Sequence, residues 1–256
     1  MTEERIINLR KERTISLTKG AVENGESLKH AFTGLRWGKI LVNGGKPEIV
    51  TKTRRKVVGN WFQKLIGRGE VIEETYQEVV YPKKNLFSGE TYKDVDLDSS
   101  ILVYDKNKKL IDKLYFGCKK LPGLTHYGDD LVGTAGIKET DNETIRIDFD
   151  DLPKEYEYLV VILNSYSHDK FDNLPYMQMR IYESKSESNI LGVTSRIFAE
   201  YRLDNSDDFK NKEALCLGAF SRCGNGWKFT ADGSMTGETS IKEMSEGSAK
   251  KFVKTL

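Results

Sequence analysis

The chain contains few of the residues that hold small domains together through disulfides or transition metals. Among its 256 residues are only 3 cysteines and 3 histidines. Three cysteines are too few for a disulfide framework, so we expect reduced thiols. The cysteines and histidines also lack the paired spacing of zinc or copper ligands. The sequence therefore disfavours both a disulfide-stabilised fold and a zinc or copper centre.

Long hydrophobic segments and targeting signals are missing as well. The longest apolar run, residues 158–163, has the length of a strand, whereas a membrane-spanning helix needs about 20 apolar residues. Residues 1–5 are mostly charged and precede no apolar region, so no secretory signal is visible. We therefore predict no transmembrane segment and a cytoplasmic location.

Motifs of common catalytic and nucleotide-binding sites are absent too. The sequence has no P-loop, no GxGxxG loop, no GxSxG nucleophile motif and no paired histidines. We therefore predict that the protein is not an enzyme. Hydrolysis by a pair of carboxylates, one acting as general acid and one as base, stays open as an alternative. Nothing in the sequence separates that role from ion binding.

Short alternating segments dominate what is present. Apolar residues occupy every second position in residues 145–149, 177–181 and 197–203, which is the period of a half-buried strand. Residues 214–222 and 227–230 flank an Asn-Gly pair, a strong signal of a hairpin. Many short strands with frequent turns favour an all-β fold, an antiparallel β-sandwich made by one domain of residues 1–256.

Signals of helices are few. Ser240 and Glu243 have the spacing of a capping box. The apolar residues that follow them fall roughly on one side, so we predict a short C-terminal helix within residues 239–256. Residues 60–66 have the pattern of one or two amphipathic turns.

Charge is segregated along the chain although the net charge is only +1. Residues 39–68 contain eight basic residues and one acid, whereas residues 129–155 contain nine acids and three bases. Charge runs usually form solvated faces, and this interpretation stays open for the basic stretch.

The acidic residues have a spacing that suggests a cation site. Asp94, Asp96 and Asp98 alternate with apolar residues, so an extended strand would place all three on one face, about 6.5–7 Å apart. These carboxylates repel one another, which calls for a metal ion, lysines or open water beside them. A second acidic segment, residues 128–143, contains three glycines, and Ca²⁺ prefers oxygen ligands from flexible loops. His126 beside this segment is interpreted as a surface residue.

Several segments, in order, resemble the TerD-type proteins of tellurium resistance and stress response. DVDLDSS (residues 94–100) resembles the DxDLDAS segment of that family, and HYGDDLVG (residues 126–133) resembles its HSGDNLTG segment. ISLTKG, GLRWG, DNE, IDFDDLP and GWKF (beginning at residues 15, 34, 141, 147 and 226) fit further family segments. The resemblance covers residues 13–42 and 92–237. It implies a small calcium-binding β-sandwich.

The resemblance also implies a set of calcium ligands. The family's ligands come from the DxDLD strand and the acidic loop. Carried over to this sequence, they fall on Asp96, Asp98, Asp129, Asp130, Glu139, Asp141 and Glu143. The same residues form the acidic clusters found from spacing.

Two departures from the family pattern change what we expect. The family's acidic loop has eight residues, whereas residues 133–143 number eleven, with Thr134 in place of a Glu and with Lys138 inside. We therefore predict one ion rather than two. The second departure is an insertion, residues 43–91, which holds most of the basic stretch together with Trp61 and Phe62.

The insertion is the part of the sequence that suggests a partner. Its basic and aromatic residues favour docking to a protein, with nucleic acid or an anionic surface as weaker options. A side hairpin packed on itself is the alternative. The function that the sequence favours is a non-enzymatic calcium-binding stress-response protein. A structural or accessory protein of a larger assembly, such as a phage particle, is the second hypothesis, and it would place the protein in a virion.

Overall fold

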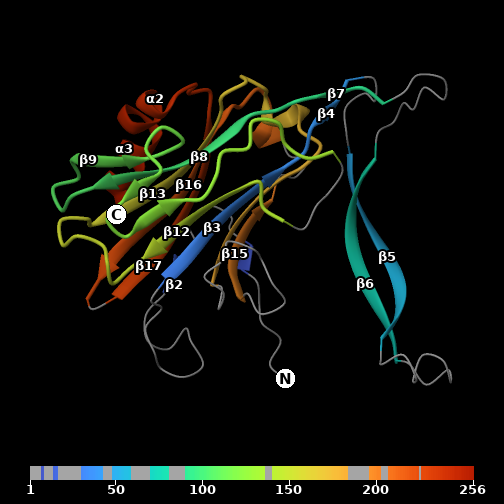
Figure 1. Ribbon diagram of the computed structural model, residues 1–256, viewed down its shortest axis with the longest axis horizontal. Helices are drawn as coiled ribbons and strands as arrows, with labels where there is room; N and C mark the ends of the chain where they lie inside the picture. Colours follow the sequence, from blue (N-terminus) through green and yellow to red (C-terminus); the bar gives the residue numbers. More distant parts are fainter. Residues whose placement is uncertain are drawn as a thin grey trace.

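The computed structural model describes residues 7–8, 14–16, 30–42, 48–58, 70–80, 90–135, 140–183, 196–202, 207–224 and 226–256. Two larger β-sheets face each other, and two C-terminal helices lie against the second of them (Figure 1). Two further sheets have two strands each.

The first sheet has seven strands in the order β1-β15-β14-β3-β12-β11-β10. Its neighbouring strands are antiparallel except β1 and β15, which run parallel. The strands are β1 (Ile7–Asn8), β3 (His30–Trp37), β10 (Lys120–Leu121), β11 (Leu124–His126), β12 (Glu143–Asp148), β14 (Met177–Glu183) and β15 (Arg196–Arg202).

The second sheet has six antiparallel strands in the order β2-β17-β16-β13-β8-β9. The strands are β2 (Thr14–Ser16), β8 (Leu97–Tyr104), β9 (Leu110–Leu114), β13 (Tyr158–Ser165), β16 (Ala214–Cys223) and β17 (Gly226–Thr236). Two short 3₁₀ helices, η1 (Phe171–Asn173) and η2 (Asp207–Phe209), lie in the connections. The predicted antiparallel β-sandwich is confirmed.

The hydrophobic run of β13 has a simple explanation, because this strand is buried on both faces. Leu159, Val161 and Leu163 face the core between the sheets. Val160 and Ile162 belong to a second core. The helices α2 (Ile241–Glu246) and α3 (Ser248–Thr255) cover that second face through Met244, Ala249 and Val253.

The capping box at Ser240 forms as predicted, with one change of partner. The Ser240 hydroxyl accepts a hydrogen bond from Glu243 N at 3.2 Å. The Glu243 carboxylate reaches back to Thr239 N at 2.6 Å. Gly247 separates α2 from α3, so the predicted C-terminal helix is a pair of short helices.

The hairpin predicted near residue 225 is also present, with its turn one residue earlier than the Asn-Gly pair. Cys223 pairs with Gly226, and Gly226 begins β17. Gly224 adopts φ +57°, a left-handed conformation that glycine tolerates at no steric cost. All three cysteines are free, as predicted.

The insertion leaves and rejoins the sandwich through a short antiparallel pair. β4 (Ile40–Leu41) pairs with β7 (Tyr92–Lys93), and Val42 N donates to Thr91 O at 2.9 Å. Between them, β5 (Glu48–Val58) and β6 (Glu70–Val80) form a long hairpin that stands apart from the sandwich (Figure 1). The predicted amphipathic turns at residues 60–66, with Trp61 and Phe62, lie outside the described residues. Within the described ranges, no helix has the length and hydrophobicity to cross a membrane.

Candidate metal centre

Two carboxylates of the DVDLDSS segment come together at the start of β8. Asp98 lies in β8 and is only 3% exposed, and Asp96 lies just before the strand. The Asp94 carboxylate is largely exposed and pairs with Lys39 Nζ at 2.6 Å. The predicted row of three carboxylates is therefore reduced to two.

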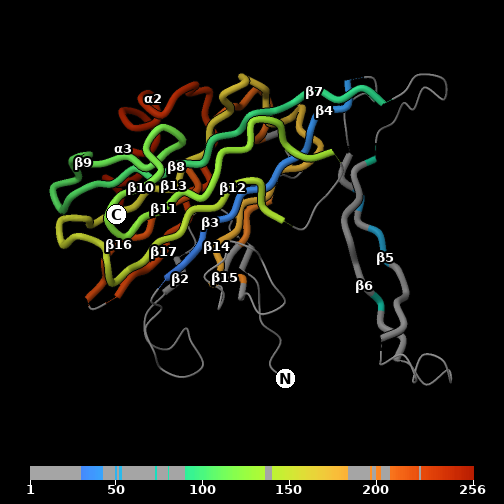
Figure 2. Tube along the Cα trace, in the orientation of Figure 1, coloured from blue at the N-terminus to red at the C-terminus, as the bar shows by residue number. Residues whose placement is uncertain are grey.

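The loop after β11 supplies a third carboxylate. Oxygen atoms of Asp96, Asp98 and Asp129 all lie within 4.8 Å of one another. Val95 N donates to Val132 O at 3.2 Å and joins the two segments, which run along the same end of the sandwich (Figure 2). The fold therefore gathers carboxylates from positions more than 30 residues apart in the sequence.

Glu143, the first residue of β12, completes what we call the carboxylate cluster: Asp96, Asp98, Asp129 and Glu143. One Glu143 oxygen accepts hydrogen bonds from Ser99 N at 2.8 Å and Ser99 Oγ at 2.7 Å. Its other oxygen is buried without a hydrogen-bond partner in the described structure, and so is one oxygen of each of the three aspartates. Four buried carboxylate oxygens thus lack a donor, which is a costly arrangement for charged groups.

Burial and mutual repulsion raise the pKa values of two members. Burial is the larger cause for Asp96, followed by the charges of Asp129 and Glu143, and the pKa rises from 3.8 to about 6. For Asp98 the pKa rises to about 7, through burial and then the charges of Glu143 and Asp96. Near neutral pH, the cluster holds its full negative charge only if a cation offsets it.

Cationic side chains near the cluster are few in the described structure. Lys119 Nζ lies 4.0 Å from Asp129 Oδ2, at the limit of an ion pair. His126 Nε2 lies 3.7 Å from Glu143 Oε2. The prediction of His126 as a surface residue was wrong, because its side chain is 1% exposed. Its Nδ1 accepts a hydrogen bond from Gly128 N at 3.3 Å.

Trp37 of the GLRWG segment holds the loops around the cluster. Its indole Nε1 donates to Val95 O at 2.8 Å, and its backbone N donates to Asn142 Oδ1 at 3.0 Å. Gly133 packs against the indole with φ +70°, and a Cβ there would lie 2.7 Å from Trp37 Nε1. The tryptophan and the glycine thus fix the segments that carry Asp96 and Asp129.

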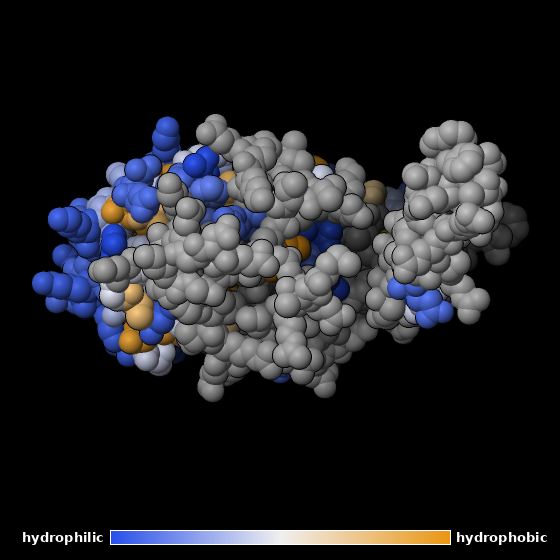
Figure 3. Space-filling view, turned by 90° about the horizontal axis from the view of Figure 1, so that it is seen from below, coloured by the Kyte–Doolittle hydropathy of each residue, from blue (hydrophilic) through white to orange (hydrophobic). Residues whose placement is uncertain are grey.

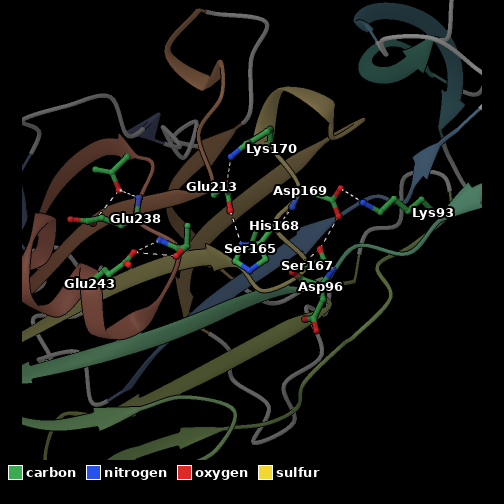
Figure 4. A network of polar contacts seen from close by, with 12 residues as sticks. Lys93, Asp96, Ser165, Ser167, His168, Asp169, Lys170, Glu213, Glu238 and Glu243 are labelled. Carbon is green, nitrogen blue, oxygen red and sulfur yellow. Dashed lines mark hydrogen bonds and ion pairs between the residues drawn. The ribbon is translucent and has the colours of Figure 1, made fainter.

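A polar chain that begins at Ser167 positions the backbone of Asp96. Ser167 Oγ accepts from Asp96 N at 3.1 Å and donates to Asp169 Oδ2 at 2.8 Å. Asp169 pairs in turn with Lys93. Figure 4 shows this chain running from Asp96 through Ser167 and Asp169 to Lys93.

Two of the remaining predicted ligands, Asp130 and Asp141, have partners of their own. Asp130 accepts from Val132 N and Gly133 N, both at 3.0 Å, and so caps its own loop. Asp141 forms a buried ion pair with Arg180 and lies outside the cluster. Burial raises the pKa of Asp141, and Arg180 opposes that rise. Glu139 lies outside the described residues.

Sequence reasoning missed residues that reach the cluster through strand pairing. Asn164 lies opposite Asp98 in the register of β13 and β8, and its side chain hydrogen-bonds Asp98. Ser99 binds Glu143, and Ser167 binds Asp96. Ser99 stands inside the DVDLDSS segment, so its position offered a signal. Asn164 and Ser167 offered none, because only the register brings them near.

The donor set fits a hard divalent cation. The available atoms are carboxylate oxygens, with serine and asparagine side chains close by, and Ca²⁺ and Mg²⁺ prefer such oxygen ligands. The histidine and cysteine ligands of zinc or copper sites do not gather here in the described structure. A bound cation would give the four unpartnered carboxylate oxygens a partner of opposite charge.

Known proteins match the chain over most of its length. The sequence model of the TerD domain matches residues 76–246. Stress response protein SCP2 of Bacillus subtilis is 26% identical over 247 residues, covering 93% of this chain and 96% of the relative. Tellurium resistance protein TerZ of Serratia marcescens is 26% identical over 163 residues, covering 62% of this chain and 75% of the relative.

A solved structure is also similar. A homologue of the telluride resistance protein TerD from Streptomyces coelicolor superposes with a TM-score of 0.49 and 13% identity, covering 85% of this chain and 95% of that chain. The family match itself spans more than half of the chain and includes every member of the carboxylate cluster. The chain belongs to the TerD domain family.

Proposed function

We propose that the protein binds one calcium ion at the carboxylate cluster and acts as a non-enzymatic binding module in a stress response. The observation that carries the proposal is the set of four buried carboxylate oxygens without a donor, three of them on residues whose ligand atoms lie within 4.8 Å of one another. Folding brings these like charges together, and a divalent cation offsets their repulsion.

The set of side-chain ligands favours calcium over magnesium. Calcium binds oxygens at about 2.3–2.6 Å, so ligands on opposite sides of one ion lie about 4.6–5.2 Å apart. The ligand atoms of Asp96, Asp98 and Asp129 all lie within 4.8 Å of one another, close enough for one ion to contact all three. Magnesium needs ligands at about 2.0–2.1 Å in a near-ideal octahedron, and it retains water. Several carboxylates held by strand and loop suit an ion that accepts many protein oxygens in an irregular geometry, as calcium does.

The partners of the neighbouring acids support one site rather than two. Asp130 is occupied by backbone N–H groups of its own loop. Asp141 is paired with Arg180. In the described part of the chain, this leaves one group of carboxylates with free ligand atoms.

The proposed biological role extends the names of the relatives to this chain. SCP2 is named as a stress response protein and TerZ as a tellurium resistance protein. The bound ion would order the loops at one end of the sandwich as a surface for protein partners in the cytoplasm. In that role the carboxylates hold the ion and perform no acid–base step.

A thermal melting experiment with added ions tests the calcium site. Calcium is expected to raise the melting temperature in a concentration-dependent way, because a ligand that binds only the folded state stabilises it by mass action. Magnesium at the same concentration is expected to give a much smaller shift. Equal shifts with both ions, or none with millimolar calcium, would contradict the proposal.

A structural role in a larger assembly is a second candidate. The observation that favours it is the β5–β6 hairpin, which pairs with no strand of the sandwich in the described structure. Because this hairpin is a sheet of its own and contributes no residue to the carboxylate cluster, it is better suited to contacts with another chain than to ion binding.

A further inference from the structure

The β5–β6 hairpin is long and regular. Each strand has 11 residues, and the antiparallel register runs from Glu48 opposite Val80 to Val58 opposite Glu70 without a bulge. Natural proteins usually shorten, bulge or cover exposed edges of this kind. In the part of the chain that the structure describes, no third strand pairs with β5 or β6.

The two strands carry opposite charge. β5 contains four basic residues and one acid, whereas β6 contains four acids and no basic residue. The register places Arg54 opposite Glu74 and Arg55 opposite Glu73. Opposite charges at facing positions stabilise antiparallel strands, and like charges destabilise them. Lys52 and Glu73 are exposed, and hydrophilic surface shows on the hairpin (Figure 3).

The acidic strand changes how the basic stretch of the sequence is interpreted. The excess positive charge of residues 48–58 is more than offset by the four acids of β6. An anionic target such as nucleic acid would meet acids and bases together on this hairpin, and the electrostatic attraction for phosphate would be largely lost. A partner with both charges in a strand arrangement is a better match.

We propose that the hairpin joins copies of this chain head to tail, with the β6 edge of one copy pairing antiparallel with the β5 edge of the next. The charges of β5 and β6 favour a second copy of this chain as the partner. Pairing β5 with β5 would place bases against bases, and pairing β6 with β6 would place acids against acids. Only the β6–β5 combination brings unlike charges together, and it can use the register that already joins the two strands within one chain.

This pairing has two consequences for the assembly. An isolated two-stranded hairpin is only marginally stable, so an added strand stabilises it. A head-to-tail contact leaves one basic edge and one acidic edge free at the ends, so growth does not stop by symmetry at two copies. The contact uses residues outside the carboxylate cluster, and it therefore does not depend on calcium.

The first experiment measures the mass of the full-length protein by analytical ultracentrifugation at rising protein concentration. The average mass is expected to at least double as concentration rises. It is expected to fall back toward one chain between about 0.1 M and 1 M NaCl, because the Debye length drops from about 10 Å to about 3 Å over that range. A single chain at all concentrations, or association that salt leaves unchanged, would overturn the proposal.

Charge-reversal variants identify the edges involved. The double variant Arg54→Glu/Arg55→Glu makes both strands acidic and is expected to abolish self-association. The double variant Glu73→Lys/Glu74→Lys leaves β6 without net charge and sets lysines opposite Arg54 and Arg55, and it is expected to do the same. Mixed one to one, the two variants set acids opposite bases in both possible β6–β5 contacts between unlike chains, so the mixture is expected to associate although neither variant associates alone.

A fourfold variant distinguishes loss of pairing between chains from unfolding of the hairpin by charge reversal. Arg54→Glu/Arg55→Glu/Glu73→Arg/Glu74→Arg exchanges the charges while keeping them complementary across the register. This variant is expected to self-associate like the natural chain. Failure of the fourfold variant to associate, or association of either double variant alone, would contradict the pairing. Binding of a short DNA duplex by the natural chain in place of self-association would assign the hairpin to nucleic acid instead.

Discussion

The carboxylate cluster and the β5–β6 hairpin arrange charge in opposite ways. In the cluster, the fold forces like charges from three separate segments together: Asp98 and Glu143 are buried, and Asp96 and Asp129 are half-buried. In the hairpin, the register places unlike charges opposite each other on an element outside the sandwich. The first arrangement is unfavourable without a ligand, whereas the second is already favourable. Ligand dependence is therefore expected of the cluster and not of the hairpin.

A third arrangement lies between these two. Asp141 and Arg180 form a buried ion pair on the first sheet, with side chains 1% and 4% exposed. Gly34 makes room for the Asp141 carboxylate, because a Cβ at this position would collide with it. Here the fold has supplied the counter-charge from its own sequence, and Asp141 is not left to a metal ion.

The largest effect is expected from removing that internal counter-charge. Arg180→Leu removes the main counter-charge of buried Asp141, and the free energy of unfolding is expected to fall by about 3–5 kcal/mol. Urea denaturation of the natural chain and the variant measures the difference. Arg146→Leu is the matched control, because Arg146 pairs with Asp148 near the surface, where such pairs contribute about 0–1 kcal/mol. Equal losses in both variants would show that burial does not distinguish the two pairs.

An intermediate effect is expected from pH. The folded pKa values of Asp96 and Asp98 are raised from 3.8 to about 6 and about 7. The folded chain therefore holds more protons than the unfolded chain between about pH 4 and pH 7, and stability without divalent cations should fall as pH rises through that window. Melting temperatures measured in a chelator at several pH values test this dependence.

Calcium and one variant provide the controls for the pH experiment. Saturating calcium should flatten the fall in stability, because the ion stabilises the ionised carboxylates. Asp98→Asn should also make the fall shallower, since it removes the group with the higher pKa. A pH profile in chelator that is flat, or that is the same with and without calcium, would contradict the electrostatic account of the cluster.

The smallest effect is expected from reversing charges on the hairpin. Arg54→Glu/Arg55→Glu should change the stability of the sandwich by no more than about 0.5 kcal/mol, the range of surface substitutions. Neither β5 nor β6 pairs with a strand of the sandwich in the described structure. Near-UV circular dichroism during denaturation, which reports on the buried Trp37, measures this. A loss of several kcal/mol would show that the hairpin is part of the sandwich core.

Individual strands could be predicted from the sequence wherever the burial of one or both faces produces a regular pattern of apolar residues. Alternation marked β12, β14 and β15, and the apolar run of β13 reflects burial on both faces. Two carboxylates two residues apart in an extended segment, Asp96 and Asp98, were also accessible to sequence reasoning. These features depend only on neighbouring positions.

The rest of the site depends on pairing between distant segments. Arg180 meets Asp141 because β14 lies beside β3, and Asn164 meets Asp98 because of the β13–β8 register. His126 is buried because β11 packs within the sheet. The basic stretch left an anionic target open as a weaker option because charge was counted along the chain, whereas the hairpin sets the acids of β6 across from it.

The most direct test of the central claim is a calorimetric calcium titration of three chains: the natural protein, Asp98→Asn and Asp94→Asn. The two variants alter the same sequence segment, but only Asp98 belongs to the cluster, while Asp94 pairs with Lys39 outside it. The account predicts binding of one ion per chain, at least a tenfold loss of affinity in Asp98→Asn (about 1.4 kcal/mol), and nearly unchanged binding in Asp94→Asn. Equal effects of the two substitutions, or no calcium binding by the natural chain, would contradict it.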